Sequence, residues 1–205
     1  MPSHPHVQRY RARLVFPMAG PPIAGGVVAA REGRLVEVGP HRNEPAADLG
    51  DVALLPGLVN AHTHLEFSSL DSPLGEAGLS MAEWIRLVVN YRRAQASPVE
   101  ACRRGLDESW RCGVRWLGEI ATAGWQAEPF ERSRLAGVVF AELLGPTERD
   151  IEPQLERARG HLQGQLRSHG HWRAGIAPHA PYTVHRELFA RSVELAEAHG
   201  VPLAF

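Results

Sequence analysis

Residues 55–66 read LPGLVNAHTHLE, an apolar run that ends in two histidines separated by one threonine. Successive side chains of a β-strand point to opposite faces, so a strand here turns His62 and His64 to one side and Thr63 to the other. The apolar run does not alternate, which is typical of a strand covered on both faces. Two imidazoles so placed can bind one metal ion. The alternative, two packed or solvent-facing histidines, is the ordinary interpretation of an isolated His-x-His pattern.

From residue 53 onward, β-prone runs alternate with amphipathic helical patterns, which predicts βα units and a parallel sheet. We expect strands after the first at residues 114–119, 137–144, 172–177 and 201–205. Helical apolar spacing, a capping box at Ser97-Pro98-Val99-Glu100 and a C-cap at Gly200 predict helices in four places. These are a helix with Met81, Trp84, Ile85 and Val88 on one face, a helix over 97–113, a helix with Ile151, Leu155, Ala158, Leu162 and Leu166 on one face, and a helix over 186–199.

Residues 1–52 predict a separate small β module. Short β-prone runs cover 11–16, 27–30 and 35–38, and Glu32-Gly33 between the last two is a hairpin turn signal. Prolines and glycines interrupt the uncharged stretch 14–30, which is shorter than the roughly 20 residues that a membrane span needs. We therefore interpret this stretch as strand, turn and strand, and expect a cytoplasmic protein.

Composition narrows the class of function. The net charge of −1 gives no sign of the basic surface that binds nucleic acid or an anionic membrane. We therefore expect a small molecule as the partner, and a homo-oligomer is possible. All 22 basic residues are arginine, so Schiff-base lysine chemistry, a P-loop and a carbamylated-lysine metal bridge are excluded for this stretch. Cys102 and Cys112 lack metal or disulfide spacing and fit a reducing compartment.

Two blocks together resemble the amidohydrolase superfamily: PGLVNAHTHLE, and GIAPHAPYTV at residues 175–184. The second block is similar to the branch of adenosine, S-adenosylhomocysteine, methylthioadenosine and aminodeoxyfutalosine deaminases and related chlorohydrolases. The resemblance implies an α/β fold, an incomplete (β/α)8 TIM barrel of about the first five strands over residues 53–205. Residues 1–52 would then be part of a composite β-sandwich.

The resemblance also implies the chemistry. His62 and His64 would bind one divalent metal ion, zinc with iron as the alternative, and metal-bound hydroxide would attack the amine-bearing carbon of an adenine-type nucleoside. His179 would contact the substrate. The third histidine, the proton-shuttling glutamate and the aspartate of the family would follow Phe205, so we expect weak zinc binding and no deaminase activity from these residues alone. The alternatives are a chlorohydrolase or other cyclic C–N hydrolase, or a non-catalytic half-barrel.

Three glutamates accompany the histidines. Glu66 shares their face if the first strand continues two residues further, where it would contact substrate or the metal shell; otherwise it is a solvated loop residue. Glu119 and Glu142, near the ends of the next two strands, are candidates for supporting roles. The remaining histidines and the pairs Arg92-Arg93 and Arg103-Arg104 are interpreted as structural or solvated.

Overall fold

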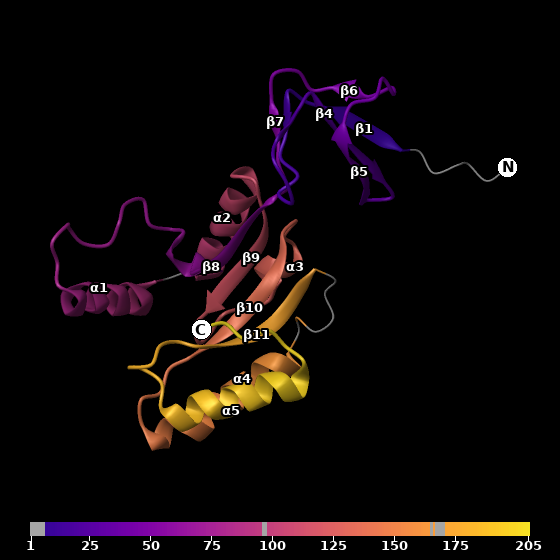
Figure 1. Cartoon of the computed structure of the whole chain (residues 1–205). Helices are drawn as coiled ribbons and strands as arrows, with labels where there is room; N and C mark the ends of the chain where they lie inside the picture. The colour runs from indigo at the N-terminus through magenta and orange to yellow at the C-terminus, as the bar shows by residue number, and fades with distance from the viewer. Residues whose placement is uncertain (1–6, 96–97, 165, 167–170) are drawn as a thin grey trace. The chain divides into compact units, whose positions relative to one another are not determined.

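The computed structural model describes residues 7–95, 98–164, 166 and 171–205. The chain divides into two compact units, Met1–Gly57 and Leu58–Phe205 (Figure 1). This division falls later than the predicted module boundary at residue 52, because strand β7 (Ala53–Leu54) pairs with β2 (Leu14–Val15) of the first unit. The predicted capping box at Ser97 and His169 lie outside the described residues.

The first unit is built from short strands in two sheets. One sheet has the order β5-β4-β1-β6, with β1 at Gln8–Arg11, β4 at Gly26–Arg31, β5 at Arg34–Pro40 and β6 at Ala47–Asp48. The other has the order β3-β2-β7, with β3 at Ile23–Ala24. Glu32 and Gly33 connect β4 to β5 with φ angles of 51° and 73°, and two positive φ angles are the signature of the predicted hairpin turn.

The single strand predicted over residues 11–16 is wrong, because the chain leaves one sheet for the other within it. Ala12 donates its backbone N–H to Gly26 O, and Arg13 donates to Gly50 O. The strand pairing of β1 ends at Arg11 and that of β2 begins at Leu14.

The second unit contains a four-stranded sheet in the order β11-β10-β9-β8, with every neighbouring pair parallel. The strands are β8 (Leu58–Thr63), β9 (Val114–Ala121), β10 (Ala136–Leu143) and β11 (Trp172–Pro178). Their positions confirm the predicted strands to within one or two residues. The sheet therefore follows the order of the sequence, as successive βα units do.

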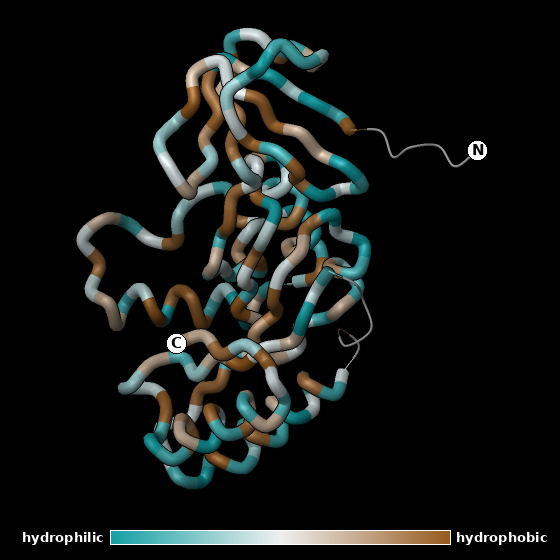
Figure 2. Tube along the Cα trace, turned by 45° about the vertical axis from the view of Figure 1, so that its right-hand side comes forward, coloured by the Kyte–Doolittle hydropathy of each residue, from teal (hydrophilic) through white to brown (hydrophobic). Residues whose placement is uncertain are grey.

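Helices connect these strands. They are η1 (Leu65–Phe67), α1 (Met81–Ala94), α2 (Pro98–Arg111), α3 (Glu128–Glu131), α4 (Glu148–Gln163) and α5 (Arg186–His199). Helices α4 and α5 lie side by side against β10 and β11 (Figure 1). In Figure 2 these lowest helices alternate between teal and brown along the chain, as amphipathic helices do. None of the helices in the described part of the chain is long and apolar enough to cross a membrane.

The two faces of the sheet carry different side chains. Leu117 and Ala121 of β9 and Val139 of β10 pack in the core on the helix-covered face. Ile120 and Phe140 form a smaller cluster with Ala177 on the other face. Strand alternation consequently puts Glu119 on the helix-covered face and Glu142 on the opposite one.

Two predictions about the strands are wrong for the described chain. Strand β8 is not covered on both faces, since Leu58 is 53% exposed and Val59 is 69% exposed. Residues 201–205 form no strand, although Leu203 makes a parallel bridge to Ile176. The helix predicted with Met81, Trp84, Ile85 and Val88 on one face is confirmed as α1, in which Val88 is buried while Met81 and Trp84 are exposed.

We predict that Gly137→Ala destabilises the second unit by at least about 1–3 kcal/mol, the usual cost of overpacking. A Cβ atom at Gly137 would lie 1.9 Å from Leu117 O of β9, so the two strands would have to separate. Gly160→Ala, in α4, is the matched control: a Cβ there meets nothing within 4 Å, and alanine favours a helix by about 1 kcal/mol. Denaturant unfolding should give changes of opposite sign, and equal stabilities for both variants would contradict this packing.

Candidate active site

Polar side chains from consecutive strands meet at one edge of the sheet. His62 lies next to last in β8 and His64 follows the strand, Glu119 and Glu142 lie near the ends of β9 and β10, and His179 follows β11. Because the four strands are parallel, their C-terminal ends share this edge. The edge therefore gathers two imidazoles, two carboxylates and a third imidazole from residues far apart in the sequence.

The histidine pair lies where β8 ends. The ring centroids of His62 and His64 are 5.5 Å apart, with the rings edge to face. Burial lowers the pKa of His64, although the charges of Glu142 and Glu66 oppose this effect. Its Nδ1 atom is buried and has no hydrogen-bond partner among the described residues. A neutral imidazole is the form that binds a metal ion, so the lowered pKa of His64 suits that purpose.

These two imidazoles are fewer ligands than a metal centre needs. Zinc sites use at least three protein ligands. Among the described residues, no group of three or more His, Cys, Asp or Glu side chains is placed to hold an ion. Two neighbouring imidazoles could therefore supply only part of a metal site, and imidazole nitrogen is a donor that suits a divalent ion.

Glu66 does not continue the strand, because η1 begins at Leu65. Its buried Oε1 accepts from Nε of Arg92 at 2.9 Å and lies 2.7 Å from Nη2, while Oε2 accepts from the Thr122 hydroxyl at 3.0 Å. Gln95 also donates to the backbone oxygen of Glu66, at 2.6 Å. Glu66 thus ties α1 to the edge of the sheet, and the interpretation of Arg92 as a solvated residue is wrong.

Glu119 lies on the helix-covered face and is 3% exposed. Both carboxylate oxygens accept from the backbone N–H of Leu65, at 3.2 and 3.0 Å. Burial raises its pKa well above the usual value, and the charges of Glu66 and Glu142 act in the same direction, while the Leu65 hydrogen bond lowers it. Glu119 therefore fixes the turn that follows the histidine pair.

Glu142 and His179 face each other on neighbouring strands. The distance from Glu142 Oε1 to His179 Nε2 is 3.9 Å. On its other side, His179 Nδ1 lies 2.7 Å from the Thr183 hydroxyl, which in turn donates to Ala180 O at 3.1 Å. Thr183 therefore holds the orientation of the His179 ring.

A cavity of about 450 Å³ lies at this edge and is lined by Glu66, Glu119, Glu142 and the helix residues Arg92 and Arg157, among others. Arg157 donates to the backbone oxygens of Glu142 and of Ala121, the latter at 3.2 Å. This arginine therefore joins the ends of β9 and β10 to α4.

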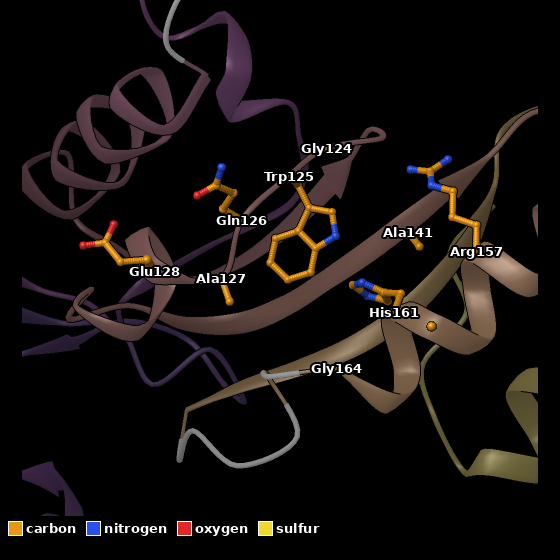
Figure 3. Close-up of a pocket in the computed structure, with 10 residues that line it drawn as sticks. Gly124, Trp125, Gln126, Ala127, Glu128, Ala141, Arg157, His161 and Gly164 are labelled. Atoms are coloured by element: carbon orange, nitrogen blue, oxygen red, sulfur yellow. The ribbon is translucent and has the colours of Figure 1, made fainter.

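A neighbouring cavity of about 480 Å³ lies between α4 and the loop that contains Trp125 (Figure 3). His161 lines it, but Nε2 of this histidine is 2.8 Å from Val139 O, and its ring packs edge to face on Trp125 at 5.1 Å. The prediction that His161 is structural is confirmed.

Sequence reasoning missed the residues that orient the site. The sequence around Arg92, Thr122 and Arg157 shows no pattern that distinguishes these side chains from solvated ones. Thr183 offered a signal, because it lies in the block around His179, four residues further on.

Comparison with known proteins identifies the family of this chain. A model of the Amidohydrolase family matches residues 53–205. The chain is 30% identical over 198 residues to an aminodeoxyfutalosine deaminase of Deinococcus radiodurans, covering 91% of this chain and 45% of that protein. The chain thus spans about half the length of the curated relatives it matches.

Two solved structures share its fold. An adenosine deaminase from Xanthomonas campestris with bound zinc has a TM-score of 0.71 and 27% identity, over 96% of this chain and 48% of that one. A zinc complex of atrazine chlorohydrolase from Arthrobacter aurescens has a TM-score of 0.72 over 95% of this chain and 51% of that one. Its identity of 18% shows the fold alone.

We predict that Glu119→Gln changes how stability depends on pH. Because the folded-state pKa of Glu119 is raised, the folded chain keeps a proton that the unfolded chain loses above about pH 4.5. Wild-type stability should therefore fall as pH rises toward the folded pKa, by about 1.4 kcal/mol for each unit of pKa difference.

Glutamine keeps an acceptor for Leu65 N–H but has no proton to lose, so the variant should be more stable than wild type at higher pH and similar to it near the unfolded pKa. Denaturant unfolding at a series of pH values measures this difference. Parallel pH profiles for wild type and Glu119→Gln would show that this carboxyl does not titrate differently on folding.

Proposed function

This chain belongs to the amidohydrolase family, and we propose that its protein is a metal-dependent aminohydrolase that deaminates an adenine-type nucleoside. The observation that carries the proposal is that His62, His64 and His179 all lie at the C-terminal ends of strands of one parallel sheet. Amidohydrolase similarity over residues 53–205 supports the same conclusion.

We propose further that residues 53–205 form the N-terminal part of a (β/α)8 barrel, with β8, β9, β10 and β11 as its first four strands. The four strands are parallel, and their order in the sheet follows their order in the sequence; both features support this architecture. The module of residues 1–52 would then contribute to a composite β-sandwich.

In this proposal His62 and His64 hold the metal ion, zinc or alternatively iron, together with ligands from later strands of such a barrel. A bound divalent ion lowers the pKa of its water to about 7 and so supplies hydroxide at neutral pH. His179 and Glu66 face the substrate. Thr183 fixes the ring of His179, and Arg92 fixes the carboxylate of Glu66 as part of the cavity wall.

A chlorohydrolase is the second candidate, favoured by the shared fold of the atrazine chlorohydrolase. The two functions differ in the leaving group. Ammonia release from adenosine derivatives, compared with chloride release from chlorinated triazines, distinguishes them. We expect ammonia and no chloride from the protein expressed from its full reading frame; chloride release alone would replace the deaminase proposal.

We predict that His62→Ala or His64→Ala weakens zinc binding by more than about 100-fold, because removing a ligand costs more than the 10–100-fold that outer partners contribute. Ammonia release should be lost with the metal. His199→Ala is the matched control, since that exposed histidine bonds to Leu195 O at the end of α5.

Competition with a chelator of known affinity gives the zinc dissociation constants. If the two substitutions at the end of β8 change zinc affinity no more than His199→Ala does, the metal lies elsewhere.

A further inference from the structure

Glu142 is a buried carboxylate that no donor satisfies within the described chain. It is 2% exposed, and its Oε2 atom has no hydrogen-bond partner among the described residues. The nearby Arg157 donates to the backbone oxygen of Glu142. A buried polar group without a partner is costly, so such a group in a native fold points to a ligand or a role in chemistry.

The ring facing Glu142 is also an acceptor. The Thr183 hydroxyl donates a hydrogen bond to Ala180 O, so it accepts a hydrogen bond from Nδ1–H of His179. In a neutral ring, this network places the proton on Nδ1 and leaves Nε2 as an acceptor. In that tautomer, Nε2 and Glu142 Oε1, 3.9 Å apart, are two acceptors that cannot bond to each other. We call Glu142 and His179 Nε2 the acceptor pair.

The other two carboxylates of the cavity are already engaged. Glu66 accepts from Arg92 and Thr122, and Glu119 accepts from the backbone N–H of Leu65. Glu142 lines the same cavity of about 450 Å³. The carboxylate of Glu142 is therefore the one that is free to accept a hydrogen bond from a molecule in this cavity.

We propose that the acceptor pair binds a proton donor of the substrate, and that Glu142 is a specificity-determining residue. The proposal rests on the proposed function in taking the substrate to be an aminated nucleoside. Two donors of such a molecule fit: the exocyclic amine, whose two N–H groups can serve both acceptors, and a sugar hydroxyl. An analogue without the donor leaves the buried carboxylate of Glu142 unpaired, which a site of this kind rejects strongly.

The two donors are distinguished by binding measurements on the metal-free protein, expressed from its full reading frame and treated with a chelator. The probes are adenosine, purine riboside, which lacks the amine, and 2′-deoxyadenosine and 3′-deoxyadenosine, which each lack one hydroxyl. Wild type should bind adenosine about 10- to 100-fold more tightly than the probe that lacks the recognised donor, the range for hydrogen bonds to charged groups.

Glu142→Gln keeps the size of the side chain and removes its charge, so it should reduce that discrimination to a few-fold while other probe ratios stay unchanged. Glu156→Gln, the same substitution on the exposed face of α4, is the matched control. Thr183→Val is a second variant. It removes the hydroxyl that accepts from Nδ1 of His179, so that the ring proton can move to Nε2. This change should weaken the same discrimination between adenosine and the probe that lacks the recognised donor. Thermal unfolding of each variant checks folding.

The proposal is overturned if Glu142→Gln matches Glu156→Gln for all four probes, or if no probe binds the metal-free wild type. Ammonia release by the metal-loaded wild type is a separate measurement. Its absence with every probe would reject the proposed deamination, while a probe ratio that depends on Glu142 would still establish the acceptor pair.

Discussion

Parallel pairing of β8, β9, β10 and β11 is the constraint on which the site depends. Parallel strands end at a common edge, so each βα connection delivers its first residues to the same place. His62, Glu142 and His179 are distant in the sequence and share one edge only because β8, β10 and β11 run in one direction. If one strand were reversed, its polar residue would lie at the opposite end of the sheet.

Charge burial at this edge is compensated in a different way for each carboxylate. Glu66 has Arg92 and Thr122, and through these contacts it holds α1. Glu119 has a backbone N–H and a raised pKa, so a proton offsets part of its burial. Glu142 has no such donor in the described chain, which makes it the carboxylate most sensitive to what enters the cavity. We therefore assign the stability of the fold to Glu66 and Glu119, and the recognition of a ligand to Glu142.

The sequence predicted the strands and the histidine pair because both follow local periodicity. Alternation within residues 58–64 places two imidazoles without knowledge of the rest of the chain, and the strands after Gly113 are apolar runs bounded by helical patterns. Periodicity could not reveal that β8 is a sheet edge, because an edge strand differs from a central one only in its neighbours. It also could not identify the partners of Glu66, since Arg92 is 26 residues away and resembles any solvated arginine. The break at Ala12 could not be predicted for the same reason, because the passage of the chain from one sheet to the other depends on tertiary contacts.

The central claim is that metal and heterocycle meet at the C-terminal edge of this sheet. A crystal structure of the zinc-loaded protein, expressed from its full reading frame and soaked with inosine as reaction product, tests that claim most directly. The account predicts zinc bonded to His62 and His64, with the purine between them and His179. Zinc bonded to other residues, or a purine bound away from Glu142 and His179, would contradict it.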